Sequence, residues 1–258
     1  MSRPFLSALL ALLLSGCGSL AGLKLLAPET HGLESVSPSL YVEIGTDSET
    51  RRRLLEDIDR AEHAVEAAYG SVQSHPVVHV CLTESCYATF GGHGSRAKVY
   101  GGRLILISPH GANWHYIAHE WSHAEMLSRL TLAAWWSLPQ WFDEGIAVAV
   151  SDAPENSEAH WQFLIAANVP RPTREALTTF KSLSQWDDAV GHYGEKKNQE
   201  RKAKGEPEIR PVYTAAGHEL RPWLAAVGRE GLLRFIADLN AGAGFASLYT
   251  SHSDPTTW

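Results

Sequence analysis

Apolar residues recur at a helical spacing in the segment 47–69. They fall on one face of the expected helix and charged residues occupy the other, the apolar set being Leu54, Leu55, Ile58, Ala61, Val65 and Ala68. Gly70 follows directly and is typical of a helix end. This segment is therefore predicted to be one long amphipathic helix.

The same period predicts further helices in the second half of the chain. Ser137 and Pro139 are typical of a helix start, and Pro222 is expected to interrupt the helix in which it lies. The predicted helices span residues 113–130, 139–150, 213–228 and 229–239, and the segment 153–180 is also helical but broken by prolines.

Strand-like runs are confined to the first half of the chain. They are short, rich in β-branched residues, and cover 39–44, 76–82 and 103–108. Because a few strands are followed by a long run of helices, the chain is predicted to have an α+β fold.

The first residues have the order of a secretory signal peptide. Arg3 is followed by an apolar run over 5–14 that is too short to span a bilayer. The next residues, Leu14-Ser15-Gly16-Cys17, resemble a bacterial lipobox, which implies cleavage after residue 16 and lipid modification of Cys17. The alternative is an ordinary signal peptide with an incidental cysteine.

This interpretation divides the chain into a signal peptide (1–16), a lipidated tether (17–37) and one domain (38–258). Within the domain, a part with the sheet extends to about 135 and a helical part covers 136–258. The expected location is the bacterial cell envelope. Since no aspartate follows Cys17, resemblance to enterobacterial sorting implies a lipid anchor in the outer membrane, facing the periplasm.

Composition and charge exclude one class of partner. Of the 258 residues, 44% are hydrophobic and 20% are charged, as in an ordinary folded soluble domain. The net charge of −7 argues against nucleic acid, which would require a concentrated basic face. The most polar stretch, 194–211, is expected to be an exposed loop or frayed helix without a function of its own.

Export also bears on the cysteines. In an oxidising compartment, Cys81 and Cys86 are expected to form a disulfide across the short turn between them. The alternative is a pair of buried free thiols.

The candidate chemistry lies in the sequence His119-Glu120-Trp121-Ser122-His123. Residues four apart on a helix point the same way, so two imidazoles can converge on one ion. Glu120 follows the first histidine and is placed to take a proton from an attacking water. Glu125, on the same helix, is expected at the surface.

A second motif, Trp141-Phe142-Asp143-Glu144-Gly145-Ile146-Ala147, follows about twenty residues later. With it, residues 101–150 resemble the gluzincin metallopeptidases, the thermolysin-like clan, especially small bacterial members with a Trp-x-x-Glu-Gly-x-Ala signature. The resemblance implies a zincin-like fold, one zinc ion per chain and Glu144 as the third ligand beside His119 and His123. It also implies that an edge strand aligns extended peptide, a role expected of 103–108.

The resemblance further implies a hydrogen-bond donor for the oxyanion of the transition state. Small relatives often carry a tyrosine at the start of a late helix, and Tyr213 matches that position. Tyr193, which follows His192, is the alternative.

Three functions are compatible with these residues. The first is a zinc metalloendopeptidase that cleaves envelope polypeptides or the peptide stems of the cell wall. The second is a non-catalytic, zinc-stabilised envelope lipoprotein that acts as an interaction or assembly factor. The third is a membrane-anchored binding module without a metal. Glu120 favours the first, since metal binding alone does not require a carboxylate between the two histidines.

Overall fold

The computed structural model describes residues 20–250, and its chain forms two compact units. The first unit contains the residues up to Glu62 together with Ser74–Ala124. The second contains His63–Gln73 together with the residues from Glu125 onward. Cys17 and the expected signal peptide lie outside the described residues. Within residues 20–250, no helix is both long enough and apolar enough to cross a membrane.

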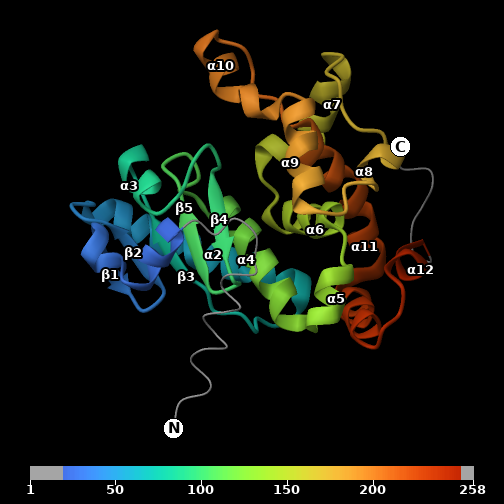
Figure 1. Cartoon of the computed structure of the whole chain (residues 1–258), viewed down its shortest axis with the longest axis horizontal. Coiled ribbons are helices and arrows are strands. Elements are labelled where there is room, and N and C mark those ends of the chain that lie inside the picture. The colour runs from blue at the N-terminus through green and yellow to red at the C-terminus, as the bar shows by residue number, and fades with distance from the viewer. Residues whose placement is uncertain (1–19, 251–258) are drawn as a thin grey trace. The chain divides into compact units, whose positions relative to one another are not determined.

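The first unit is built on a five-stranded mixed sheet (Figure 1). Its strands are β1 (Leu33–Ser37), β2 (Leu40–Glu43), β3 (Val77–Val80), β4 (Ala97–Tyr100) and β5 (Leu104–Ile107). The spatial order is β1-β2-β3-β5-β4, in which β3 runs parallel to β2 and to β5 while β1 and β4 pair antiparallel. The remaining elements that begin in this unit are η1 (Leu20–Leu26), η2 (Pro28–His31), α2 (Ser48–Tyr69), α3 (Glu84–Thr89) and α4 (Trp114–Arg129).

The second unit is helical (Figure 1). It contains α5 (Leu132–Ser137), α6 (Gln140–Ser151), η3 (Pro154–Asn156), α7 (Glu158–Ala166), α8 (Arg174–Leu177), α9 (Leu183–His192), η4 (Glu195–Lys197), α10 (Asn198–Ala203), α11 (Pro211–Asn240) and α12 (Phe245–Thr250). Its core is an aromatic cluster in which rings of α6, α11 and α12 meet at centroid separations of 5 to 6 Å: Trp141, Phe142, Trp223, Phe235, Phe245 and Tyr249. The predicted α+β fold is confirmed.

The structure corrects the expected edge strand. A strand, β5, does form within residues 103–108, but β5 pairs with β3 on one side and β4 on the other. The outer strand is β4, whose glycine-flanked sequence did not indicate a strand. The free edge on this side of the sheet therefore belongs to Ala97–Tyr100.

Residues 20–37 also differ from the expected tether. Leu20–Leu26 and Pro28–His31 form 3-10 helices, and Leu33–Ser37 is a strand of the sheet. Leu25 and Leu33 are buried in a cluster with Tyr87 and Phe90. Because these apolar side chains are removed from water, the segment is part of the folded unit rather than a linker.

The expected disulfide is confirmed, whereas the helix interruption expected at Pro222 is not. Cys81, after β3, is bonded to Cys86 of α3. In α11 the backbone stays helical at Pro222 and breaks at Gly228, where φ is 62°. A positive φ is accessible to glycine at little steric cost, so the two predicted helices meet at Gly228 as expected, while Pro222 does not interrupt the first of them.

His79 is a fully buried imidazole in β3. Its Nδ1 lies 3.3 Å from the carbonyl oxygen of Ile105, and its ring stacks on Tyr41 at 5.3 Å. Burial disfavours the charged form and lowers the pKa of His79 to about 4, from an ordinary value of 6.5. Between about pH 4 and pH 6.5 this imidazole is therefore neutral in the folded chain but protonated in the unfolded chain.

Acidification is expected to destabilise the fold through His79. Between pH 6.5 and 4 the unfolded state binds more protons at this site, so the free energy of unfolding falls as the pH falls, by up to about 3 kcal/mol. Urea unfolding of the wild type and His79→Phe across this range would measure the effect. The difference between the two proteins should change with pH. A difference that stays constant from pH 7 to pH 4 would contradict the prediction.

Candidate metal centre

Helix α4 carries both histidines and is fixed at its start by polar contacts within the first unit. The carboxylate of Asp57 in α2 accepts a hydrogen bond from the backbone N–H of Trp114, and the side chain of Asn113 accepts one from His115. Arg53 donates to the carbonyl oxygen of Ala112 at 2.9 Å. Acceptors at a helix N-terminus satisfy N–H groups that have no partner within the helix, so these contacts set where α4 begins.

Further along α4, two contacts anchor the helix sideways. The indole Nε1 of Trp121 donates to the carbonyl oxygen of Ser74 at 3.2 Å. Glu125, expected at the surface, is instead fully buried, where it accepts the backbone N–H of Gln73 and pairs with Arg129 at 2.7 Å. The expectation was wrong because the backbone N–H that Glu125 accepts belongs to Gln73, fifty-two residues away, and helical spacing cannot reveal such a partner.

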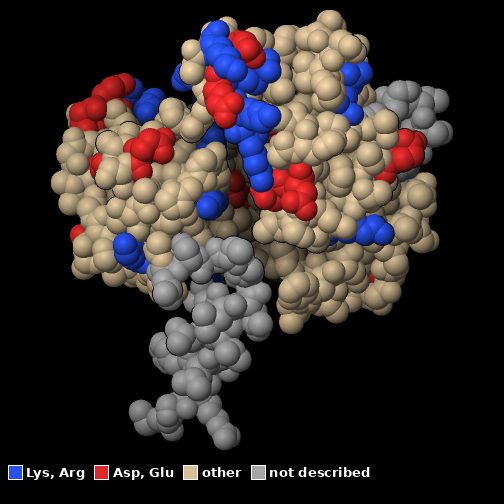
Figure 2. Space-filling model, turned by 45° about the horizontal axis from the view of Figure 1, so that its top comes forward, with Lys and Arg blue, Asp and Glu red and all other residues tan. Residues whose placement is uncertain are grey.

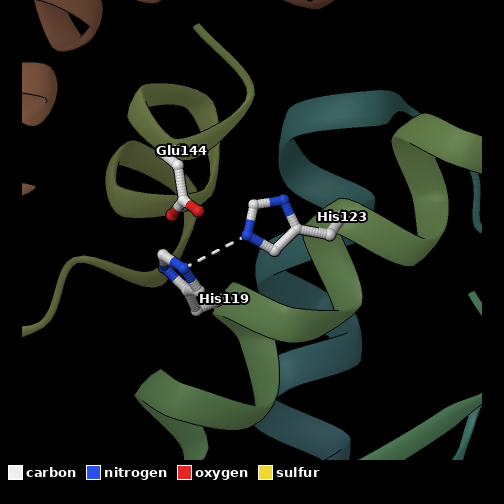
Figure 3. A group of neighbouring side chains, drawn as sticks. All are labelled: His119, His123 and Glu144. Atoms are coloured by element: carbon white, nitrogen blue, oxygen red, sulfur yellow. Dashed lines mark hydrogen bonds between the residues drawn. The ribbon is translucent and has the colours of Figure 1, made fainter. Parts of the chain in front are cut away.

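The two histidines converge as their spacing predicts (Figure 3). Their Nε2 atoms lie 3.2 Å apart and their ring planes meet at 83°. Two nitrogens bound to one tetrahedral zinc at about 2.0–2.1 Å would be separated by about 3.3 Å. The His119 and His123 nitrogens thus already have the spacing of two zinc ligands.

Glu144 completes the group. Figure 3 shows its carboxylate, from α6, directed toward the two imidazoles of α4. One ligand atom from each of the three residues lies within 4.8 Å of the other two, and all three residues are buried. Among the described residues this is the group of His, Cys, Asp and Glu side chains that could hold a metal ion. Two imidazoles and one carboxylate form one of the standard catalytic zinc sets.

A contact that the sequence did not single out orients the carboxylate. The side-chain amide of Gln140 donates to Glu144 Oε1 at 2.9 Å, across one turn of α6. The first N–H groups of α6 are in turn held by the carbonyl oxygens of Phe180 and Lys181. A glutamine four residues before the motif glutamate is the signal that was available, since i and i+4 side chains of a helix meet.

Glu120 lies between the two histidines on α4 and is 9% exposed. Its charge reaches two side chains of the edge strand β4. Burial lowers the pKa of Lys98, and the negative charge of Glu120 acts in the opposite direction. Burial raises the pKa of Tyr100, and Glu120 raises it further. The Glu120 carboxylate therefore lies in the part of the first unit that also contains the free sheet edge.

The two candidate tyrosines have different surroundings. Tyr213 is in the first turn of α11; burial raises its pKa well above the ordinary value, and the negative charge of Glu144 adds to this effect. Tyr193 directly follows α9 and lines a hollow of about 320 Å³ with Phe180 and Ala189. Glu144 therefore lies within electrostatic reach of Tyr213.

Glycines bring α11 close to α6. A Cβ at Gly145 would lie 2.8 Å from Leu220 Cγ and 3.0 Å from the carbonyl oxygen of Ala216. A Cβ at Gly217 would lie 2.5 Å from a methyl carbon of Val148. The glycine next to Glu144 therefore allows a backbone approach that a larger residue would prevent, and Tyr213 lies one turn before this crossing.

Comparisons of the chain with protein-family models, with curated proteins and with solved structures found no match. The function of this chain is therefore inferred from its own side chains and their arrangement.

Proposed function

We propose that this chain is a zinc-dependent peptidase of the gluzincin type. One observation carries the proposal: His119, His123 and Glu144 offer three buried ligand atoms within 4.8 Å of one another, and Glu120 lies between the histidines. Three protein ligands leave a coordination position for a water or substrate, which is the arrangement of catalytic rather than structural zinc sites.

The fit of zinc to these residues rests on donor chemistry and spacing. Imidazole nitrogen and carboxylate oxygen are both common zinc ligands, and the 3.2 Å between the Nε2 atoms suits tetrahedral geometry. The Gln140 amide holds the carboxylate as an outer partner, which is how ligand orientation is maintained in metal sites. When bound, zinc would supply Lewis acidity that activates water and polarises a peptide carbonyl.

The remaining steps belong to side chains of the chain. Glu120 would accept a proton from the attacking water and deliver it to the nitrogen of the leaving amine as the C–N bond breaks. Tyr213 would donate a hydrogen bond from its hydroxyl to the oxygen on which negative charge develops. The negative charge of Glu144 raises the pKa of Tyr213, and this electrostatic proximity supports the role.

The substrate would bind as an extended strand. The backbone groups on the outer edge of β4 are available to pair with an extended peptide, so β4 takes the role expected of 103–108. Lys98 and Tyr100 of this strand lie within the electrostatic influence of Glu120. Polypeptides of the cell envelope are the proposed substrates, with the enzyme held at the membrane through Cys17.

Chelation is expected to remove activity reversibly. The wild-type chain should contain about one zinc per molecule and cleave an unfolded, fluorescently labelled protein. Dialysis against a chelator should abolish cleavage, and zinc should restore it. Zinc content is measured by atomic absorption and cleavage by release of fluorescence. Stoichiometric zinc without any cleavage would instead support the non-catalytic envelope lipoprotein, and absence of zinc would support the metal-free binding module.

A further inference from the structure

The polar stretch 194–211, expected to be functionless, folds as an arm whose two ends are fastened together. Its first residues form η4 and α10, and it returns to the start of α11. The side chain of Asn198 donates to the carbonyl oxygen of Ile209 at 2.7 Å and accepts the N–H of Ile209 at 3.0 Å. Figure 2 shows side chains of both charges gathered in the upper region where α10 lies. The exposed tip is solvated, whereas the base of the arm is structured.

Glu195, at the base of the arm, closes the N-terminus of α11. It is 6% exposed, and its Oε1 accepts the backbone N–H of Val212 at 2.5 Å and that of Tyr213 at 3.4 Å. Arg210, the residue before the helix, provides no side-chain cap. A carboxylate at this end of a helix accepts hydrogen bonds from otherwise unpaired N–H groups and interacts favourably with the positive end of the helix dipole. The arm therefore supplies the cap that the helix lacks.

The ring of Tyr213 is held from two sides. The guanidinium carbon of Arg210 lies 4.8 Å from the centre of the ring, and the Trp186 ring meets it edge-on at 5.1 Å and 90°. Arg210 also lies 3.8 Å from Glu195 Oε2. The backbone of Tyr213 is thus held by Glu195 itself, and one of the two groups against its ring, Arg210, lies beside Glu195.

Retaining a carboxylate at this position is costly. Burial raises the pKa of Glu195 to about 7, although the positive charge of Arg210 and the two N–H groups act in the opposite direction. A helix N-terminus can be capped without such a cost by a serine or an aspartate at the residue directly before the helix.

We propose that Glu195 is a positioning residue for Tyr213. Its carboxylate fixes the first turn of α11 and so determines where the Tyr213 hydroxyl lies relative to Glu144. This inference rests on the proposed function, in which that hydroxyl donates to the oxyanion. Glu195 itself contacts no reacting atom, so its effect on hydrolysis must pass through Tyr213.

A double-mutant cycle tests this coupling. Tyr213→Phe is expected to lower kcat about a hundredfold. Glu195→Leu, which fills the same space without an acceptor, is expected to lower kcat about tenfold while KM and zinc content stay within about twofold. If Glu195 acts through the hydroxyl, the double variant has the kcat of Tyr213→Phe alone. Glu195→Gln keeps an acceptor oxygen and should recover kcat to within about threefold of wild type.

Glu200→Gln is the matched control, because Glu200 is an exposed carboxylate on the same arm and should leave kcat unchanged. Circular dichroism checks that each variant is folded. Should Glu195→Leu not fold, Glu195→Asp is used in its place, because it withdraws the carboxylate by one methylene. Its effect on kcat should likewise vanish when Tyr213→Phe is also present. A wild-type kcat in folded Glu195→Leu, or a double variant that loses the full product of both effects, would overturn the proposal.

Amide hydrogen exchange provides a readout that needs no activity. The N–H groups of Val212 and Tyr213 should exchange at least about tenfold faster in Glu195→Leu than in wild type, because their acceptor is gone. Unchanged exchange would overturn the proposed contact. If the wild type cleaves no peptide at all, the proposed function fails for every variant alike. If the wild type cleaves, Tyr213→Phe lowers kcat and Glu195→Leu does not, the positioning role fails while the proposed function stands.

Discussion

Glu120→Gln is expected to abolish hydrolysis while leaving zinc bound. An amide has nearly the shape of the carboxylate but cannot accept a proton from water, and general base catalysis of this kind contributes about 10²–10⁴ in rate. A fall in kcat of about 10³-fold, or about 4 kcal/mol, is the expected result. Zinc content should remain at the wild-type value because Glu120 is not one of the three converging ligands.

The assay is cleavage of the unfolded protein substrate, with zinc measured on the same sample. Glu200→Gln is again the matched control, since it makes the same chemical change on an exposed helix. Wild-type rates in Glu120→Gln would remove Glu120 from the mechanism. Loss of zinc together with activity would mean that the carboxylate is itself part of the metal centre.

Glu144→Ala is expected to have the second large effect, on metal affinity. Loss of an outer partner of a metal site typically costs 10–100-fold, so loss of one of three ligands should cost more than about a hundredfold. Gln140→Leu, which removes only the hydrogen bond to Glu144, should cost about tenfold. Competition with a chromophoric chelator at constant pH measures both.

The two variants are informative as a pair. Because Gln140 contacts the ligand and not the metal, the order of affinities should be wild type, Gln140→Leu, then Glu144→Ala. If Glu144→Ala binds zinc like wild type, the third ligand has been misassigned. If Gln140→Leu is the weaker binder of the two, the glutamine rather than the glutamate governs the metal.

Periodicity was sufficient to place the candidate metal ligands on helices. His119 and His123 share a helix face because four residues make about one turn, and that local rule holds whatever the surrounding fold. Glu144 also lay on a predicted helix, but its distance from the histidines depends on tertiary structure. The family resemblance supplied that pairing, and the structure brings the three ligand atoms together.

Contacts that cross from one segment to another could not be predicted from the sequence. Strand β4 is short and flanked by glycines, so its pairing with β5 is decided by the partner strand rather than by its own propensity. Glu195 and Val212 are seventeen residues apart, and no periodicity connects them. Glu125 appeared to be a surface carboxylate because its acceptor role depends on Gln73, fifty-two residues away.

Gly145 has no side chain, and α11 already occupies the space that a side chain there would need. An added Cβ would meet both the Leu220 side chain and the carbonyl oxygen of Ala216, so a substitution at this residue requires one of them to move away. A single methyl group at residue 145 would press against α11, the helix that carries Tyr213, while every polar group stays chemically intact. The rate of hydrolysis could then be lowered by side-chain volume alone, with no change in charge or in metal ligation.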